Sequence, residues 1–216
     1  RRTHGGQALA VEDINRKPLS YTKLIAGSFA LGRKIGEGLK PGQTLGLMMP
    51  NSNAGAVAFF AAQAQGLVPA MLNFSTGTSN VLSACETARI DTVITSRRFI
   101  LQARLGTMAE ALSAKVKLVY LEDIAQNMDL SDKLYGLSAS LFARQLYSRV
   151  GRKPSDPAVI LFTSGSEGTP KGVLLSHANL LSNLLQIAAR VAFTSSAIVF
   201  TALPIFHSFG LTGGML

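Results

Sequence analysis

Short apolar runs alternate with longer amphipathic stretches along this sequence, and that alternation constrains the fold more than any other feature. Apolar runs bounded by glycine, proline or asparagine predict strands, and apolar residues repeating every three or four positions predict helices. We predict strands at residues 44–49, 68–72, 92–95, 117–121, 158–163 and 198–203. We predict helices from residue 22 onward and at 54–65, 80–88, 99–112, 130–147 and 176–192. Strands alternating with helices favour an α/β fold with a mainly parallel sheet flanked by helices.

Three segments add detail to this pattern. Residues 8–12 and 19–21 predict a hairpin around a turn-rich segment. Apolar residues of the helix predicted at 130–147 are expected to face the interior, namely Leu134, Leu137, Leu141 and Phe142. Residues 148–157 contain two prolines and several basic side chains, so they are the best candidate for a boundary between subdomains.

The composition excludes several classes of protein. Hydrophobic residues make up 47% and charged residues 15%, which is typical of a globular protein and not of a disordered one. No apolar run approaches the ~20 residues that a membrane-spanning helix needs. The net charge of +9 has two interpretations: an acidic partner such as a nucleotide, a membrane surface or an acidic protein, or a fragment whose acidic remainder is missing. No nucleic-acid-binding signature is present, so we expect no nucleic acid partner.

The only cysteine, Cys85, excludes an internal disulfide and fits a reducing compartment. It lies among apolar neighbours in a predicted helix, so we expect a buried thiol. The sequence starts without methionine and ends in an apolar, glycine-rich segment, so we expect residues 1–216 to be a fragment of a longer chain. We expect a cytoplasmic protein, and any association with the inner membrane would come through a part outside this sequence.

The most informative segment is a polar loop at residues 162–172, directly after a predicted apolar strand. Four hydroxyls, three glycines and one lysine are packed into eleven residues. Glycines let the backbone approach a ligand, hydroxyls and free N–H groups donate to phosphate oxygens, and a lysine adds positive charge. These properties predict a polyphosphate site formed by Thr163, Ser164, Gly165, Ser166, Glu167, Gly168, Thr169 and Lys171.

Two common nucleotide-binding motifs are excluded. A Walker A loop needs glycine before its lysine and serine or threonine after it, whereas Pro170 and Gly172 flank Lys171. The dinucleotide fingerprint has its only near match at residues 36–42, where the glycine spacing is wrong and a predicted helix precedes it. A flexible surface turn is the alternative interpretation of the loop, and its dense, specific composition disfavours it.

Residues 163–172 resemble the phosphate-binding signature of the adenylate-forming (AMP-binding) enzymes, which include acyl-CoA synthetases, peptide-synthetase adenylation domains and luciferases. Residues 203–208 are similar to the next core motif of that superfamily, and residues 19–22, 42–51 and 65–69 match its earlier landmarks in order. The resemblance covers nearly the whole sequence. It implies the N-terminal part of an adenylate-forming large domain.

One departure from the superfamily pattern points to a branch. Glu167 stands where the loop usually has threonine, and this form, together with residues 206–212, is similar to the acyl-acyl-carrier-protein synthetase half of bifunctional 2-acylglycerophosphoethanolamine acyltransferase. Residues 95–99 and 120–123 also resemble that branch. Its acyltransferase half would show histidine, four residues and aspartate, which no histidine here does, so we expect that half to be absent. Glu167 either interacts with a bound Mg²⁺ or lies solvated on the loop, and both interpretations stay open.

The resemblance implies a fatty acid ligase of phospholipid metabolism that acts in two steps. A fatty carboxylate attacks the α-phosphate of Mg²⁺-bound ATP, and the thiol of acyl carrier protein or coenzyme A then accepts the acyl group. The loop would hold the β- and γ-phosphates, and His207 and Phe206 would lie at the acyl pocket. A histidine satisfied within the core is the alternative for His207. No residue is assigned as catalytic, and no segment has metal-ligand spacing.

Two other functions stay open: an acyl-CoA synthetase of another branch, and a nucleotide-binding module without turnover. The basic cluster before the loop could meet a carrier protein or a membrane, or form a solvated helix end; it comprises Arg144, Arg149, Arg152 and Lys153. The resembled enzymes complete their nucleotide site with later segments, so we expect the 216 residues alone to be inactive.

Overall fold

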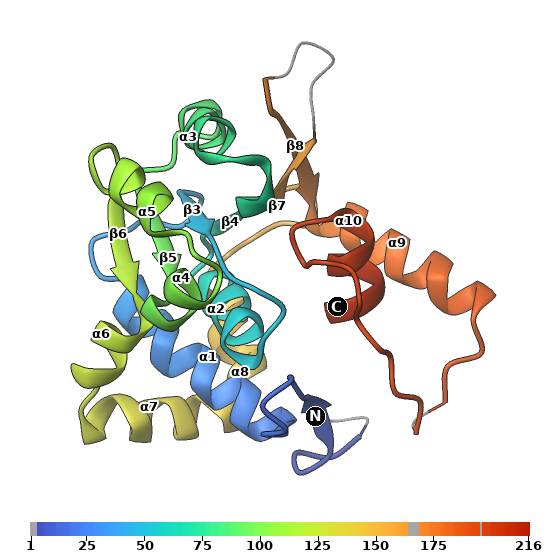
Figure 1. The fold of residues 1–216 in the computed structure, drawn as a ribbon. Helices are drawn as coiled ribbons and strands as arrows, with labels where there is room; N and C mark the ends of the chain where they lie inside the picture. The colour runs from blue at the N-terminus through green and yellow to red at the C-terminus, as the bar shows by residue number, and fades with distance from the viewer. Residues whose placement is uncertain (1–3, 164–168, 195) are drawn as a thin grey trace.

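The computed structural model describes residues 4–163, 169–194 and 196–216 (Figure 1). The strands are β1 (Leu9–Val11), β2 (Leu19–Ser20), β3 (Thr44–Leu47), β4 (Val68–Met71), β5 (Thr92–Thr95), β6 (Lys117–Tyr120), β7 (Pro157–Thr163) and β8 (Lys171–Ser176). The longer helices are α1 (Tyr21–Ile35), α2 (Asn53–Ala64), α3 (Thr78–Thr87), α5 (Gly106–Ser113), α7 (Leu130–Leu141) and α9 (His177–Arg190). The shorter ones are α4 (Arg97–Gln102), α6 (Leu121–Gln126), α8 (Ala143–Arg149) and α10 (Ser208–Gly210), with single turns η1 (Phe74–Thr76) and η2 (Leu211–Met215).

The central sheet has the strand order β6-β5-β3-β4-β7-β8. Its first five strands pair in parallel, whereas β8 runs antiparallel to β7. β1 and β2 form a separate antiparallel pair, which confirms the predicted N-terminal hairpin. Helices flank the sheet, as Figure 1 shows. The predicted α/β class with a mainly parallel sheet is therefore confirmed.

Two predicted helices are each divided in two. The helix predicted at 99–112 is instead α4 and α5, because Arg104 between them adopts a left-handed backbone with a φ of 55°. The helix predicted at 130–147 is α7 and α8, which meet at Phe142. The short helix α6 follows β6 directly and is absent from the prediction, because six residues are too few to show a helical period.

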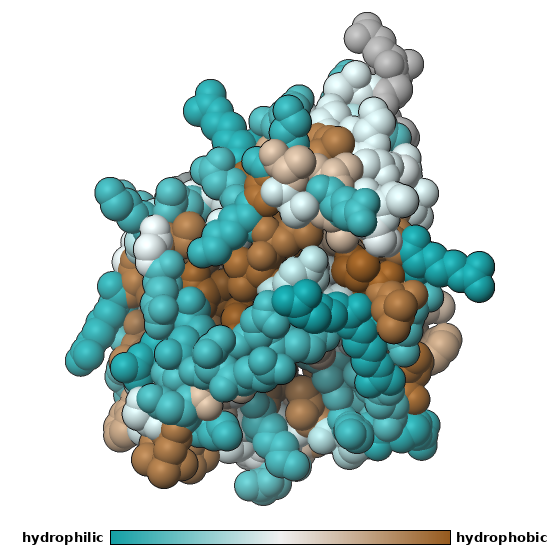
Figure 2. All heavy atoms as spheres, turned by 60° about the vertical axis from the view of Figure 1, so that its left-hand side comes forward, coloured by the Kyte–Doolittle hydropathy of each residue, from teal (hydrophilic) through white to brown (hydrophobic). Residues whose placement is uncertain are grey.

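The predicted inward face of α7 is wrong. Leu134, Leu137 and Leu141 are 57%, 54% and 60% exposed, and Phe142 is 57% exposed. The face that packs on α1 instead carries small residues, and a Cβ atom at Gly136 would overlap the carbonyl oxygen of Ala26. Backbone contact this close excludes larger side chains, so the leucines lie outside. Figure 2 shows hydrophobic side chains at the lower edge of the molecule, at the height at which Figure 1 draws α7.

The C-terminal third contains two further corrections. β8 is a strand that the sequence pattern does not predict, because its short apolar run lies between the polar loop and the helix predicted at 176–192. Val173 and Leu174 of this strand are 40% and 54% exposed. The strand predicted at 198–203 does not form among the described residues. Its apolar run pairs with no other strand, and Ile198 and Phe200 are 86% and 89% exposed. A strand needs a hydrogen-bonding neighbour, which this run lacks in the described part of the chain.

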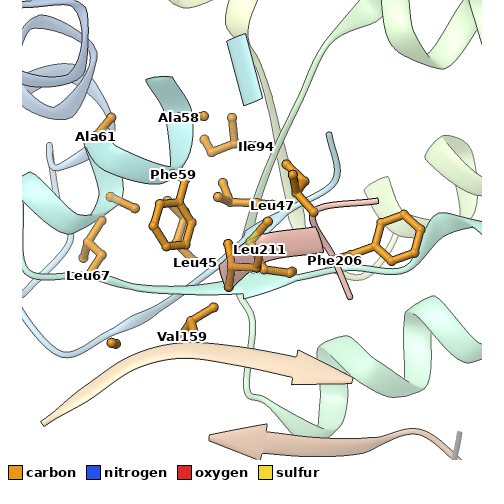
Figure 3. Close-up of a cluster of buried hydrophobic side chains, with 14 of the residues drawn as sticks. Leu45, Leu47, Ala58, Phe59, Ala61, Leu67, Ile94, Val159, Phe206 and Leu211 are labelled. Carbon is orange, nitrogen blue, oxygen red and sulfur yellow. The ribbon is translucent and has the colours of Figure 1, made fainter. Parts of the chain in front are cut away.

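Alternate side chains of the central strands enter two cores on opposite faces of the sheet. On β7, Val159 and Leu161 pack in the core that includes Phe59 of α2, whereas Ile160 packs in the core that includes Cys85 of α3. This alternation is the two-residue period of a strand. Figure 3 shows the first core, where side chains of β3, β7, α2 and the C-terminal segment lie close together.

The thiol of Cys85 belongs to the second core. It is 3% exposed, and burial raises its pKa to about 11. A thiol with so high a pKa is protonated and unreactive near neutral pH. The predicted burial of Cys85 is therefore confirmed.

Candidate functional site

The predicted phosphate loop joins two antiparallel strands, and not a strand and a helix as the sequence pattern suggests. β7 and β8 are the two arms of a hairpin, and their register ends with Thr163 opposite Lys171. Five members of the predicted set lie outside the described residues, namely Ser164, Gly165, Ser166, Glu167 and Gly168. The structure gives the positions of Thr163, Thr169 and Lys171.

β7 gives this hairpin a firmly anchored base. Ala158 and Val159 are completely buried, and Leu161 is only 4% exposed. Burial ends at the far end of the strand, where Thr163 is exposed. The buried half of β7 is held in the core, and it therefore fixes the position of the exposed end at Thr163. Binding loops are commonly positioned by a rigid scaffold in this way.

The exposed end of the hairpin combines a positive charge with hydroxyl groups. Lys171, Thr163 and Thr169 are all exposed to solvent. Among the described residues, no carboxylate lies within ion-pair distance of Lys171. An ammonium group beside hydroxyl donors fits an anion with several oxygen atoms, and a polyphosphate is such an anion. Chemically, this arrangement can bind and orient a phosphate chain.

The side chain of Asn51 holds in place the beginning of the predicted motif at residues 203–208. The Nδ2 group of Asn51 donates to the carbonyl oxygens of Leu203 at 2.8 Å and Thr201 at 3.3 Å. Its Oδ1 atom accepts from the backbone N–H of Ile205 at 2.9 Å. Asn51 lies in the turn between β3 and α2, so these bonds fix the backbone before His207 against the end of a central strand.

The chain then folds back tightly around Pro204. A Cβ atom at Gly210 would overlap the Pro204 carbonyl group, so only glycine fits this approach. Further along, the Thr201 hydroxyl donates to the carbonyl oxygen of Gly214 at 2.9 Å. Leu211 is completely buried and anchors the segment in the core. The position of His207 is thus set by backbone packing on both sides.

Phe206 and His207 lie in different environments. Phe206 is 4% exposed, and its ring meets Phe74 edge-on with the centroids 5.0 Å apart. Phe74 in turn meets Phe99 edge-on at 4.8 Å. The His207 side chain is exposed, with its ring centroid 4.8 Å from that of Phe206. The Phe206 side chain is therefore part of the core, whereas the His207 side chain next to it projects into solvent.

The structure packs both predicted motifs into one core. Val159 of β7 belongs to the same buried cluster as Ile205 and Phe206. Asn51 is the positioning residue that the sequence pattern misses, because the turn around it predicts only a helix cap. Its partners lie 150 to 154 residues further along the chain, a separation that no local pattern reports. A polar side chain directly after a buried strand is the one signal that could have pointed to it.

Fold and site together define an α/β protein whose central sheet anchors the β7–β8 hairpin, with Thr163 and Lys171 at its exposed end. The sequence model of the AMP-binding enzyme family matches residues 2–216. The chain belongs to that family.

Several curated proteins are similar to this chain, and each alignment covers only a small part of the relative's own length. The long-chain-fatty-acid–CoA ligase of Escherichia coli O157:H7 is 29% identical over 207 residues, which cover 86% of this chain and 37% of the ligase. Acyl-CoA ligase sidI of Beauveria bassiana is 29% identical over 182 residues, 83% of this chain and 32% of the ligase. TtuA, a medium-chain-fatty-acid–[acyl-carrier-protein] ligase of Teredinibacter turnerae, is 34% identical over 93 residues, 41% of this chain and 14% of TtuA. The chain thus spans about a third of the length of the first two relatives.

Solved structures share the fold. ATP-bound MatB from Rhodopseudomonas palustris superimposes with a TM-score of 0.73 and 26% identity, over 97% of this chain and 40% of MatB. VinN in complex with 3-methylaspartate gives the same TM-score at 22% identity, over 95% of this chain and 53% of VinN. The second likeness supports the fold alone.

Proposed function

We propose that this chain forms the first part of the adenylation domain of a ligase that activates a fatty acid with ATP. Membership of the AMP-binding family over residues 2–216 is the observation that carries the proposal. The fatty-acid ligases among the relatives and the ATP bound in MatB support it. Because the chain spans about a third of such ligases, the activity is proposed for the whole protein. A boundary between subdomains at 148–157 is part of this proposal.

The hairpin is proposed to hold the β- and γ-phosphates of ATP. Lys171 would offset their charge, and the hydroxyls of Thr163 and Thr169 would donate to their oxygens. The same role is proposed for the loop residues Ser164, Gly165, Ser166 and Gly168. Mg²⁺ usually reaches such sites through the phosphates and one or two carboxylates, so Glu167 would either contact the ion or stay solvated.

The proposed reaction has two steps. A carboxylate oxygen of the fatty acid attacks the α-phosphorus of ATP, the bond to the β-phosphate oxygen breaks, and pyrophosphate leaves. A thiol then attacks the acyl carbon, loses its proton, and releases AMP as the thioester forms. The chain's own contribution to the first step is to hold the leaving pyrophosphate in line, which is catalysis by positioning and charge stabilisation.

The acyl acceptor is proposed to be acyl carrier protein, with coenzyme A as the alternative. TtuA, whose name states a carrier-protein acceptor, supports this choice, whereas the long-chain relatives are coenzyme A ligases. The loop form with Glu167 resembles the bifunctional branch, so we further propose a parent enzyme of phospholipid metabolism. Its acyltransferase half would lie outside these residues.

Replacing Lys171 tests the phosphate site. In the complete gene product, Lys171→Ala should lower fatty-acid-dependent pyrophosphate release by ~10-fold or more, because a charge-assisted contact is worth ~1.5–3 kcal/mol. Lys117→Ala is the matched control, since Lys117 is also an exposed lysine at the first position of an outer strand. Equal rates for the two variants would contradict the assignment of Lys171, and a wild-type enzyme without fatty-acid-dependent release would contradict the proposed function.

His207 and Phe206 are proposed to border the acyl site, His207 by its exposed ring and Phe206 as the wall behind it. His207→Ala should raise the KM for the fatty acid about tenfold and leave the KM for ATP within about twofold, because one polar contact to the carboxylate is lost. The control is His177→Ala at the start of α9. A variant that affects ATP more than the fatty acid would move His207 to the nucleotide side.

A further inference from the structure

One face of α7 carries a continuous stripe of exposed leucines. Leu130, Leu134, Leu137 and Leu141 are 70%, 57%, 54% and 60% exposed. Their spacing of four, three and four residues places them within about 60° of one another, since a helix turns about 100° per residue. Exposed leucines are ordinary when scattered, but a row along a whole helix marks a contact surface.

The packing of α7 on α1 fixes this orientation. The opposite side of α7 carries Gly136, Ala139 and Asp132, and all three are buried. Gly136 touches the α1 backbone so closely that no Cβ atom fits there. The buried Asp132 carboxylate also accepts an ion pair from Lys34 of α1 at 3.1 Å. α7 therefore cannot rotate its leucines inward without breaking both contacts.

The segment that follows α7 adds two exposed aromatic side chains. Phe142, between α7 and α8, is 57% exposed, and Tyr147 on α8 is 37% exposed. The α7–α8 apolar face is defined as Leu130, Leu134, Leu137, Leu141, Phe142 and Tyr147. It is a convex helix surface, so a partner that presents a flat, deformable apolar layer suits it better than a partner that needs a groove.

Basic side chains predominate in the segment that carries this face, although the exposed Asp129 caps the N-terminus of α7. Between residues 130 and 153 the sequence has five basic side chains, Lys133, Arg144, Arg149, Arg152 and Lys153. The only acidic side chain in that interval is Asp132, which is 1% exposed and paired with α1. In the described part of the chain, Lys133, Arg144 and Arg149 are exposed and take part in no ion pair. These three charges are therefore available to an anionic partner.

We propose that the α7–α8 apolar face docks on the surface of a lipid bilayer that contains anionic headgroups. An amphipathic helix with leucines on one face and basic residues beside them is the pattern that lies in the plane of a membrane interface. Leucines enter the boundary of the acyl chains, and lysine and arginine side chains reach the phosphate groups. Among the described residues no helix is long and apolar enough to cross a membrane, so this contact is peripheral. The inference does not depend on the proposed ligase chemistry.

Vesicle binding of the complete gene product tests the proposal. The protein should sediment with vesicles of phosphatidylglycerol and phosphatidylcholine, and bind vesicles of phosphatidylcholine alone about tenfold more weakly. The double variant Leu134→Ser/Leu137→Ser should bind the mixed vesicles at least about tenfold more weakly. The matched control is Leu101→Ser, which removes an 80% exposed leucine from α4 and should change binding by less than about twofold.

A fluorescence measurement keeps the test independent of how the double variant folds. Cys85 is the only cysteine of residues 1–216 and is buried, so a polarity-sensitive dye attached to Leu134→Cys should report from α7 alone once any cysteine in the rest of the gene product is replaced by serine. The dye should shift to shorter wavelength when mixed vesicles are added, and the same dye on Leu101→Cys should not. Arg144→Gln/Arg149→Gln should weaken binding about tenfold and reduce its dependence on salt.

Three results would overturn the proposal. The first is no binding of the wild-type protein to anionic vesicles. The second is unchanged binding by the leucine variant together with an unshifted dye on Leu134→Cys. The third is a wild-type oligomer that the leucine variant converts to a monomer without loss of vesicle binding, which would assign the face to another copy of the chain.

Discussion

Asn51 illustrates how one side chain can carry the geometry of a distant segment. Its amide makes three hydrogen bonds to the backbone of residues 201–205, with donor–acceptor distances of 2.8 to 3.3 Å. Few other contacts of comparable polarity hold that segment, because its apolar run pairs with no strand among the described residues. Asn51 therefore fixes the segment before His207, and the close approach of Gly210 to Pro204 fixes the segment after it.

Asn51→Ala should loosen residues 201–210 without unfolding the sheet. Each lost bond leaves a backbone group unpaired, at a net cost of about 1–3 kcal/mol in total for a half-buried site. Amide hydrogen exchange in this segment of the complete protein should accelerate at least about tenfold, while exchange in β3 and β4 stays unchanged.

The control is Asn127→Ala, which removes an exposed asparagine that bonds only to the carbonyl oxygen of Asp123 in its own helix. It should leave exchange in residues 201–210 as in the wild type. If Asn51→Ala behaves like this control, the segment is held by its apolar contacts and not by the asparagine.

Short helices in this protein depend on side chains from neighbouring elements. α4 has six residues, too few to be stable alone, and the Glu122 carboxylate of α6 covers its N-terminus. Glu122 accepts from the Ser96 hydroxyl at 2.7 Å and from the N–H groups of Arg97 at 3.0 Å and Arg98 at 3.2 Å. Burial alone would raise the pKa of Glu122, but these three donors favour the carboxylate and lower its pKa below the ordinary 4.5. The charged form also suits the positive end of a helix.

Glu122→Gln should therefore lower the melting temperature in a pH-dependent way. The stabilisation by the carboxylate is fully present above pH 4.5 and is lost as the pH falls through the lower pKa of the folded state. Near neutral pH the variant should lose about 1 kcal/mol, as for other helix caps, and at a pH below the folded-state pKa it should match the wild type. Thermal unfolding followed by circular dichroism measures both. Glu110→Gln on the exposed side of α5 is the control and should show no such difference; a Glu122→Gln effect independent of pH would show that shape and not charge matters.

The central sheet brings together segments that are far apart in the sequence. β7 pairs with β4 on one side and β8 on the other, so the hairpin that carries Thr163 and Lys171 extends directly from the central core. The same core receives Ile205 and Phe206 from the C-terminal segment. α7 packs on α1, away from the β7–β8 hairpin in Figure 1, and its leucines are exposed. The proposed nucleotide site and the proposed lipid-docking face thus belong to different elements, and substitutions in one can be tested without touching the other.

Local patterns in the sequence were enough to predict the fold class and the parallel strands, and they are the basis of the proposed phosphate loop. The periods of a strand and of a helix, and the chemistry of a glycine- and hydroxyl-rich loop, are properties of neighbouring residues. Cys85 follows the same logic, since its apolar neighbours in the sequence remain its neighbours in the core.

Tertiary packing determined the features that these patterns missed. The leucines of α7 lie outside because Gly136, on the opposite side of the helix, lets the backbones of α7 and α1 touch. The spacing of apolar residues in the sequence does not determine which face of a helix packs against a neighbour. The run at 198–203 is not a strand because no strand edge lies beside it in the described structure, and strand pairing is a contact between segments. β8 forms because β7 offers such an edge. Asn51 acquires its role from partners more than a hundred residues away, where the fold, and not the local sequence, brings the atoms together.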